Sequence, residues 1–196
     1  MKSSKGSAFE REICKKLSMW WTDGKRDDVF WRSSNSGGRA TMRAKSGKRT
    51  HGHCGDIAAV DPIGAPLTSL VTLELKRGYT GTSFADVIDK PAHAKQNMFE
   101  AFVEQAETAS VLSGSQFWAL ITRRNKKIAL IFIPKEFLKY LEDRGCDMVH
   151  GCPIVKLKTS FLQGNKTRKT RTVFGFSLDD FLERFKIGYV FEDSMD

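Results

Sequence analysis

The sequence has no apolar run long enough to cross a membrane, since a spanning helix needs roughly 18 or more consecutive apolar residues. Its first residues also lack the apolar segment of a secretory signal peptide. We therefore expect a cytoplasmic protein without a membrane span.

Cysteine is scarce as well, with four residues in a chain of 196. This density is too low for a disulfide-stabilised scaffold, and a cytoplasmic setting would keep the thiols reduced. Two clusters combine cysteine with histidine, namely His51, His53 and Cys54, and Cys146, His150 and Cys152. A structural zinc site across these clusters is an alternative, but no Cys-x2-Cys pair supports it, so we favour unligated cysteines.

Acidic residues are missing from two long stretches, although the whole chain contains 23 of them. The first stretch lies between Asp28 and Asp56, and the second between Asp147 and Asp179. Both are rich in lysine and arginine, the net charge is +9, and the pI is about 9.5. Such a basic chain favours a polyanionic partner, nucleic acid first and an anionic membrane surface second.

What is present indicates one globular domain with a sizeable core, because 40% of the residues are hydrophobic. Phe9, Ile13, Leu17 and Trp20 recur at helical spacing, which predicts an amphipathic helix over residues 5–21. Other apolar patterns predict strands at 29–32, 57–60, 70–77, 117–122 and 128–133, and helices at 91–112 and 135–143. Strands at 153–158 and 171–176 and a helix at 178–185 are expected to follow.

Three charged residues stand out on two of these strands. Asp56 precedes the strand at 57–60, while Glu74 and Lys76 lie two residues apart and so share one face of the strand at 70–77. Residues 61–66 have turn chemistry, so we expect a hairpin that brings Asp56 within reach of Glu74. Two carboxylates and an ammonium can hold a hard divalent cation beside a phosphate. Because Glu-x-Lys is frequent on solvated strands, ordinary surface charges are the alternative.

The spacing Asp-x17-Glu-x-Lys resembles the core of the PD-(D/E)XK nuclease superfamily, with Gly55 where proline is customary. Over roughly residues 3–135 the chain is also similar to archaeal-type Holliday-junction resolvases, because it has four motifs in the same order. These are Gly-x2-Phe-Glu-Arg-Glu, Arg followed by Ser and Gly, Gly-Asp-Ile, and Glu-Leu-Lys. The resemblance implies an α/β protein whose restriction-endonuclease-like core, a central mixed β-sheet flanked by helices, occupies residues 1–145. Residues 146–196 would be a C-terminal α/β elaboration of the same domain. A prokaryotic or phage source fits this resemblance.

The resemblance also implies a metal site. Asp56, Glu74 and the backbone carbonyl of Leu75 would bind Mg²⁺, for which Mn²⁺ could substitute. Lys76 would position the attacking water.

Further residues are implied as participants by the same resemblance. Glu10 of the first helix would join the metal site, and a serine of the loop after Arg32, Ser34 or Ser36, would assist catalysis. On helix geometry alone, Glu10 is explained as well by a solvated acid near a helix N-terminus. Gln105 has a counterpart in some superfamily members but fits an ordinary polar neighbour equally well.

Basic residues outside the motif are candidates for DNA contacts, because lysine and arginine near phosphates supply salt-dependent affinity. They occupy the first acid-free stretch and the turns near residues 123–127 and 164–169, where exposure to solvent alone would also suit them. The candidates are Arg32, Arg39, Arg43, Lys45, Lys48, Arg49, Arg123, Arg124, Lys166, Arg168 and Lys169.

These observations predict a metal-dependent DNA endonuclease. A Holliday-junction resolvase or branched-DNA nuclease is one interpretation, and it would act as a homodimer because a four-way junction has two-fold symmetry. A sequence-specific or mismatch-directed duplex endonuclease is the alternative. A non-catalytic DNA-binding protein on a nuclease scaffold is another, but the intact Asp56, Glu74 and Lys76 argue against it.

Overall fold

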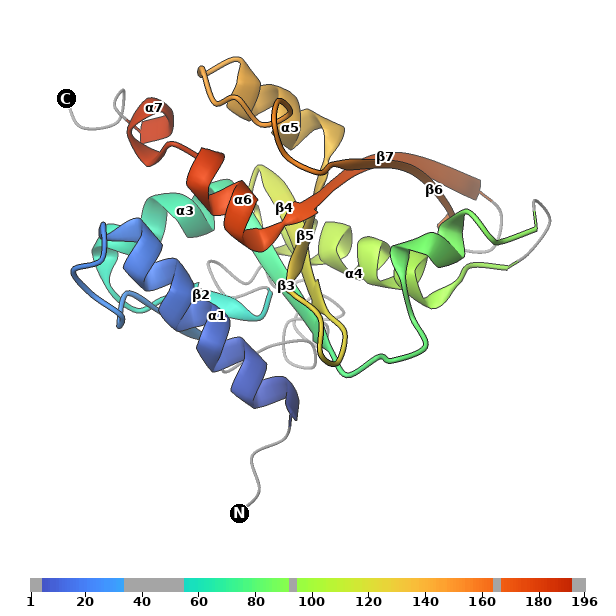
Figure 1. Cartoon of the computed structure of the whole chain (residues 1–196), viewed down its shortest axis with the longest axis horizontal. Coiled ribbons are helices and arrows are strands. Elements are labelled where there is room, and N and C mark those ends of the chain that lie inside the picture. Colours follow the sequence, from blue (N-terminus) through green and yellow to red (C-terminus); the bar gives the residue numbers. More distant parts are fainter. Residues whose placement is uncertain (1–4, 34–54, 92–94, 164–166, 192–196) are drawn as a thin grey trace.

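The computed structural model describes residues 5–33, 55–91, 95–163 and 167–191. Five strands form one sheet in the order β3-β4-β5-β7-β6 (Figure 1). Their bounds are β3 Val71–Arg77, β4 Phe117–Arg123, β5 Leu130–Pro134, β6 Val155–Gln163 and β7 Thr167–Ser177. β3 is parallel to β4 and the other neighbours are antiparallel, so the predicted central mixed sheet is confirmed.

One face of this sheet carries the larger core, which the first helix and the C-terminal helices cover. α1 (Lys5–Trp21) buries Phe9, Ile13 and Leu17 against it, so the predicted amphipathic helix is confirmed. Leu73 and Leu75 of β3 point into the same core. The other helices on this face are α3 Ala65–Leu70, α5 Lys135–Glu142, α6 Leu178–Arg184 and α7 Ile187–Phe191.

A separate two-stranded antiparallel sheet connects α1 to β3. Its strands are β1 (Phe30–Arg32) and β2 (Ile57–Ala59). The Oγ of Ser18 on α1 donates to the carbonyl of Cys14 and accepts from the backbone N–H of Phe30 at 2.9 Å. This contact fixes β1 against the helix and so sets the position of Arg32 relative to α1.

The connection between β2 and β3 differs from the hairpin that we expected. Residues 61–66 do not form a tight turn, because Pro62–Gly64 is a 3-10 helix, η1, and α3 follows it directly. Asp61 caps η1 by accepting from the N–H of Ile63, and prolines occupy the early positions of both helices, where a missing N–H costs nothing. β3 therefore begins at Val71, and β2 pairs with β1 instead.

The opposite face of the sheet is covered by α4 (Met98–Ser113), which builds a second core. Phe99, Phe102 and Val103 pack there on Leu120 and Phe132 of the sheet. We expected this helix to begin at Pro91, but it begins at Met98. Asn97 and Glu100 form a reciprocal capping box, which is a stronger start signal than an isolated proline. A short 3-10 helix, η2 (Phe84–Val87), lies before it.

The C-terminal part of the chain extends the same sheet. β7 pairs with β5, and β6 forms the edge beyond it, so the strands predicted after residue 145 are confirmed and are longer than expected. The Oγ of Ser177 accepts from the N–H of Asp180, so the helix after it begins as the sequence predicts. No helix in the described ranges combines the length and apolar character needed to span a membrane.

Candidate active site

β3 presents Glu74 and Lys76 on the face that α4 covers. The Nζ of Lys76 donates to the Oε1 of Glu74 at 2.7 Å, and the Nε2 of Gln105 on α4 donates to the same oxygen at 2.6 Å. The Glu74 side chain is 5% exposed and that of Lys76 13%. Side chains two apart on a strand therefore meet as the alternation predicts, and both are held inside the protein.

Asp56 reaches Glu74 along the free edge of β3. Its backbone N–H donates to the carbonyl of Leu73 at 2.9 Å, and its Oδ2 accepts from the N–H of Leu75 at 2.8 Å. The proximity inferred from the sequence is thus present, although it arises from contacts at the strand edge and not from a hairpin.

Gly55 makes this approach sterically feasible. Its φ is +106°, which proline cannot adopt and other L-residues rarely adopt. A Cβ at this position would lie 2.8 Å from the Cγ2 of Thr72 and 2.9 Å from the carbonyl oxygen of Leu73. The departure from the customary proline therefore has a local structural reason.

Glu10 lies near these groups, on the turn of α1 that faces β1. Its carboxylate accepts a charged hydrogen bond from the guanidinium of Arg32 on β1. Glu10 is therefore not a purely solvated acid, and Arg32 is bound to a carboxylate at the edge of the site.

Glu10, Asp56, Glu74, Lys76 and Gln105 line one open cavity of about 250 Å³. Gly6, Leu75, Arg77 and Tyr79 complete its walls. Tyr79 follows β3 in a loop, and no motif in the sequence marks it as a site residue.

Glu10 and Glu74 of this cavity each pair with a cation, whereas no described cation forms an ion pair with Asp56. Burial, and after it the negative charge of Glu74, raises the pKa of Asp56 to about 7. Lys76 opposes this effect but is already hydrogen-bonded to Glu74. A divalent cation between Asp56 and Glu74 would relieve the repulsion, and carboxylate oxygens are the ligands that Mg²⁺ prefers.

The backbone of Leu75 is oriented to support such an ion. Its N–H points across the free edge of β3 to Asp56, and the carbonyl of a strand residue points to the same side as its N–H. The Leu75 carbonyl therefore faces the cavity edge, beside the two carboxylates. This oxygen donor set fits a hard divalent cation that also keeps several waters.

No group of three or more His, Cys, Asp or Glu side chains in the described ranges is arranged as a complete metal site. Glu10, whose carboxylate pairs with Arg32, thus forms no such group with Asp56 and Glu74. In the second cluster that could have held zinc, the Nδ1 of His150 contacts the Oδ1 of Asp147 at 2.9 Å. His51, His53 and Cys54 lie outside the described residues.

Besides Arg32, which pairs with Glu10, the basic candidates divide into three groups. Arg123 extends from β4 to α1, where it pairs with Glu12 and stacks on Phe9, 4.6 Å from the ring centre. Arg124 is exposed. The third group lies outside the described residues, namely Arg39, Arg43, Lys45, Lys48, Arg49 and Lys166, and the side chains of Arg168 and Lys169 are not described either. The two serine candidates, Ser34 and Ser36, also lie outside the described residues.

Comparison with known protein families places the chain among nucleases. A family model described as "Phage putative PDDEXK endonuclease" matches residues 1–192 of the chain. Searches of curated proteins and of solved structures found no match.

Proposed function

The chain belongs to this family of phage PDDEXK endonucleases, and from that premise we propose that it is a Mg²⁺-dependent endodeoxyribonuclease whose catalytic residues are Asp56, Glu74 and Lys76. The observation that carries the proposal is their convergence, with Glu10 and Gln105, in one cavity at the free edge of β3. The restriction-endonuclease-like fold of the superfamily agrees with the mixed sheet flanked by helices.

Asp56, Glu74 and the Leu75 carbonyl would hold the metal ion, either Mg²⁺ or Mn²⁺. When bound, the ion supplies positive charge to the phosphate and makes a water molecule more acidic. Asp56 keeps its place through the Leu75 N–H, and Gln105 holds the Glu74 carboxylate in orientation. These contacts leave the Oδ1 of Asp56 and the Oε2 of Glu74 with no hydrogen-bond partner among the described residues.

Lys76 has the chemistry to position the attacking water. Its ammonium is held by Glu74 at the cavity wall, so it can donate to a water or to a phosphate oxygen without reorganisation. Glu10 would orient a second water or a second metal ion, with Arg32 fixing its carboxylate. Ser36, or Ser34 in its place, is proposed on the resemblance alone.

DNA would bind through the basic surface. We assign this role to Arg124 and to the basic residues of the 39–49 stretch, with Lys166, Arg168 and Lys169 as a second region. Arg32 and Arg123 are set apart from the other candidates because each already pairs with a glutamate. Their main effect would be on the position of α1.

The preferred DNA structure is proposed on resemblance to junction resolvases. A four-way junction or another branched DNA would be cut by a homodimer, since two symmetric strands must be cut together. A matched panel of linear duplex, flap, single strand and four-way junction, incubated with Mg²⁺ or with EDTA, tests both the nuclease activity and the preferred DNA structure. Mg²⁺-dependent cutting of any member supports the nuclease, and preference for the junction by a dimer supports the resolvase. A sequence-specific duplex endonuclease would instead cut the linear DNA at a defined site.

Failure to cut any member of the panel would contradict the nuclease proposal and leave the third interpretation, a non-catalytic DNA-binding protein. A cytoplasmic location for this phage-family protein is part of the same proposal.

A further inference from the structure

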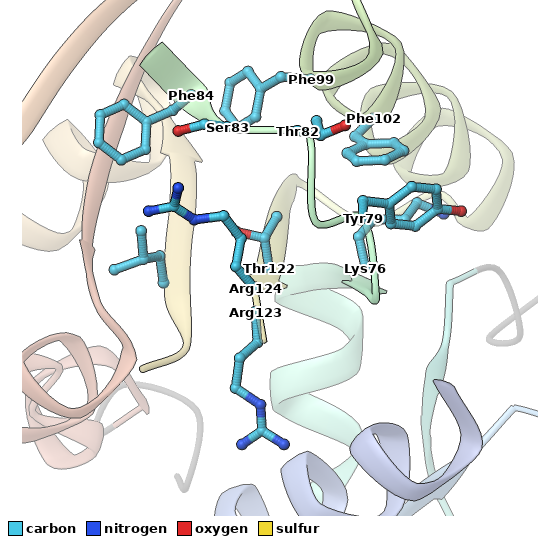
Figure 2. Close-up of a pocket in the computed structure, with 11 residues that line it drawn as sticks. Lys76, Tyr79, Thr82, Ser83, Phe84, Phe99, Phe102, Thr122, Arg123 and Arg124 are labelled. Carbon is cyan, nitrogen blue, oxygen red and sulfur yellow. The ribbon is translucent and has the colours of Figure 1, made fainter. Parts of the chain in front are cut away.

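A second, smaller hollow adjoins the active-site cavity and shares Lys76 and Tyr79 with it. Figure 2 shows it between the loop after β3, the start of α4 and the end of β4. Its floor is aromatic, with Phe99 and Phe102, and its rim carries hydroxyl and guanidinium groups.

The polar rim follows from the register of the sheet. Lys76 of β3 is paired with Thr122 of β4, so the threonine stands beside the catalytic lysine on the same sheet face. Arg124 follows two residues later, and Thr82 comes from the loop above. The hydroxyls of Thr82 and Thr122 have no hydrogen-bond partner within the described ranges, which leaves them available to a ligand.

Arg124 is available as well, in contrast to its neighbour. Figure 2 shows the two guanidinium groups diverging, that of Arg124 toward Ser83 and Phe84 and that of Arg123 away from the hollow. Arg123 is engaged by Glu12, whereas no described carboxylate pairs with Arg124. Within the described part of the chain, the hollow therefore has a free cation on its rim in addition to Lys76.

Size and charge restrict what can enter. The hollow holds about 30 Å³, which is room for roughly two water-sized atoms and too little for a nucleobase. Two hydroxyls, a guanidinium and a nearby ammonium can all donate hydrogen bonds, and two of these four groups are cations, so the site favours a hydrogen-bond acceptor with negative charge. The two non-bridging oxygens of a phosphodiester satisfy both conditions.

We infer that this hollow binds a backbone phosphate beside the one that is cut, with Arg124, Thr122 and Thr82 as its ligands. The inference rests on the proposed function. Neighbouring strands lie about 4.8 Å apart, and one DNA strand rises about 3.4 Å per nucleotide, so the bound phosphate lies one or two positions from the cut. Such a contact fixes the register of the DNA in the active site without reading its sequence.

The experiment neutralises one phosphate at a time. A single methylphosphonate is placed at each of the three positions on either side of the cut, and kcat/KM is measured for the wild-type protein, for Arg124→Gln and for Lys127→Gln. Lys127 is the matched control, because it is an exposed cation of the same turn that does not line the hollow.

For the wild type we expect one position at which the methylphosphonate lowers kcat/KM about 10-fold or more, the size of one missing charged hydrogen bond. Arg124→Gln should be slower by a similar factor on unmodified DNA and show no further decrease at that position. Lys127→Gln should retain the full position-specific decrease. Thr122→Val should make that decrease smaller without removing it. A general attraction of DNA by Arg124 would not depend on Thr122, so this variant distinguishes the subsite from such an attraction.

If Arg124→Gln and the methylphosphonate lower kcat/KM independently of each other at every position, the inference is overturned, while the nuclease proposal stands. Coupling of Arg124 to an abasic substitution, with none to a methylphosphonate, would also overturn it, because the hollow would then contact a base. Absence of cleavage of unmodified DNA by the wild type would remove the proposed function and the inference together.

Discussion

The backbone N–H of Leu75 donates a 2.8 Å hydrogen bond to the Oδ2 of Asp56, which ties a residue before β2 to the strand that carries Glu74. The N–H of Asp56 returns a bond to the carbonyl of Leu73. Because both bonds use the backbone of β3, the separation of the two carboxylates is set by the edge of the strand. The geometry of the candidate metal site therefore depends on how closely residue 55 can approach β3.

Gly55→Ala should damage this approach. The added Cβ meets the Thr72 methyl and the Leu73 carbonyl and also requires a strained φ, so we expect a decrease of about 1–3 kcal/mol in the free energy of unfolding together with a loss of cleavage. Urea denaturation measures the first effect. Gly24→Ala is the control, since Gly24 also has a positive φ but has open space around it. Equal decreases in the two variants would show that the contact with β3 is not what requires glycine.

Arg123→Gln should lower stability and leave DNA affinity almost unchanged. The residue pairs with Glu12 and stacks on Phe9, contacts together worth about 1 kcal/mol at a partly exposed site. The hydrogen bond from Arg123 lowers the pKa of Glu12 below its ordinary value of 4.5. The stabilisation by the pair with Glu12 is therefore complete above pH 4.5 and is lost as the pH falls through the lowered pKa of the folded state.

Denaturation of the wild type and Arg123→Gln at pH 7 and at acidic pH tests this assignment. The difference between them should shrink on acidification. A difference that is independent of pH would assign the stabilisation to the stacking on Phe9 and not to the pair with Glu12. A large drop in DNA affinity would assign Arg123 to the DNA surface instead.

Cys14 should be inert in the folded protein. It is fully buried on α1, and burial raises the pKa of its thiol to about 12, so almost no thiolate is present at pH 8. Iodoacetamide labelling followed by mass spectrometry should modify the partly exposed Cys152 in the native protein and Cys14 only after denaturation. Rapid labelling of native Cys14 would mean that α1 separates from β1 readily.

Binding to duplex DNA should weaken steeply with salt. Replacement of Arg43, Lys45, Lys48 and Arg49 together by glutamine should flatten the slope of log affinity against log salt by about 0.9 for each phosphate that these side chains neutralise. An unchanged slope would exclude this stretch from the DNA interface and favour Lys166, Arg168 and Lys169.

The sequence predicted the elements whose apolar spacing is regular, and it predicted Asp56, Glu74 and Lys76 as a group. The prediction of a hairpin turn at residues 61–66 was wrong, because the two prolines that suggest a turn occupy early positions of short helices. The start of α4 was placed too early, since Pro91 is locally a good helix start and only the reciprocal bonds of Asn97 and Glu100 decide otherwise.

Long-range partners were beyond sequence reasoning. Arg123 and Glu12 are 111 residues apart, and their pairing depends on how α1 lies against the end of β4. The roles of Gly55 and Tyr79 also depend on tertiary contacts, since a positive φ and a position on a cavity wall leave no pattern in a single sequence. Such contacts distinguish Arg123 from Arg124, which the sequence treats as equivalent.

The most direct test of the account is Mg²⁺-dependent DNA cleavage by the wild type and by Asp56→Asn, Glu74→Gln and Lys76→Ala, with binding measured in parallel. We expect kcat of each variant to fall by at least about 100-fold while it still folds and binds DNA, because these groups act in the chemistry and the basic surface supplies affinity. Glu142→Gln, an exposed carboxylate at the end of α5, should cut as the wild type does. Substantial Mg²⁺-dependent cleavage by any of the three variants would contradict the assignment of the active site.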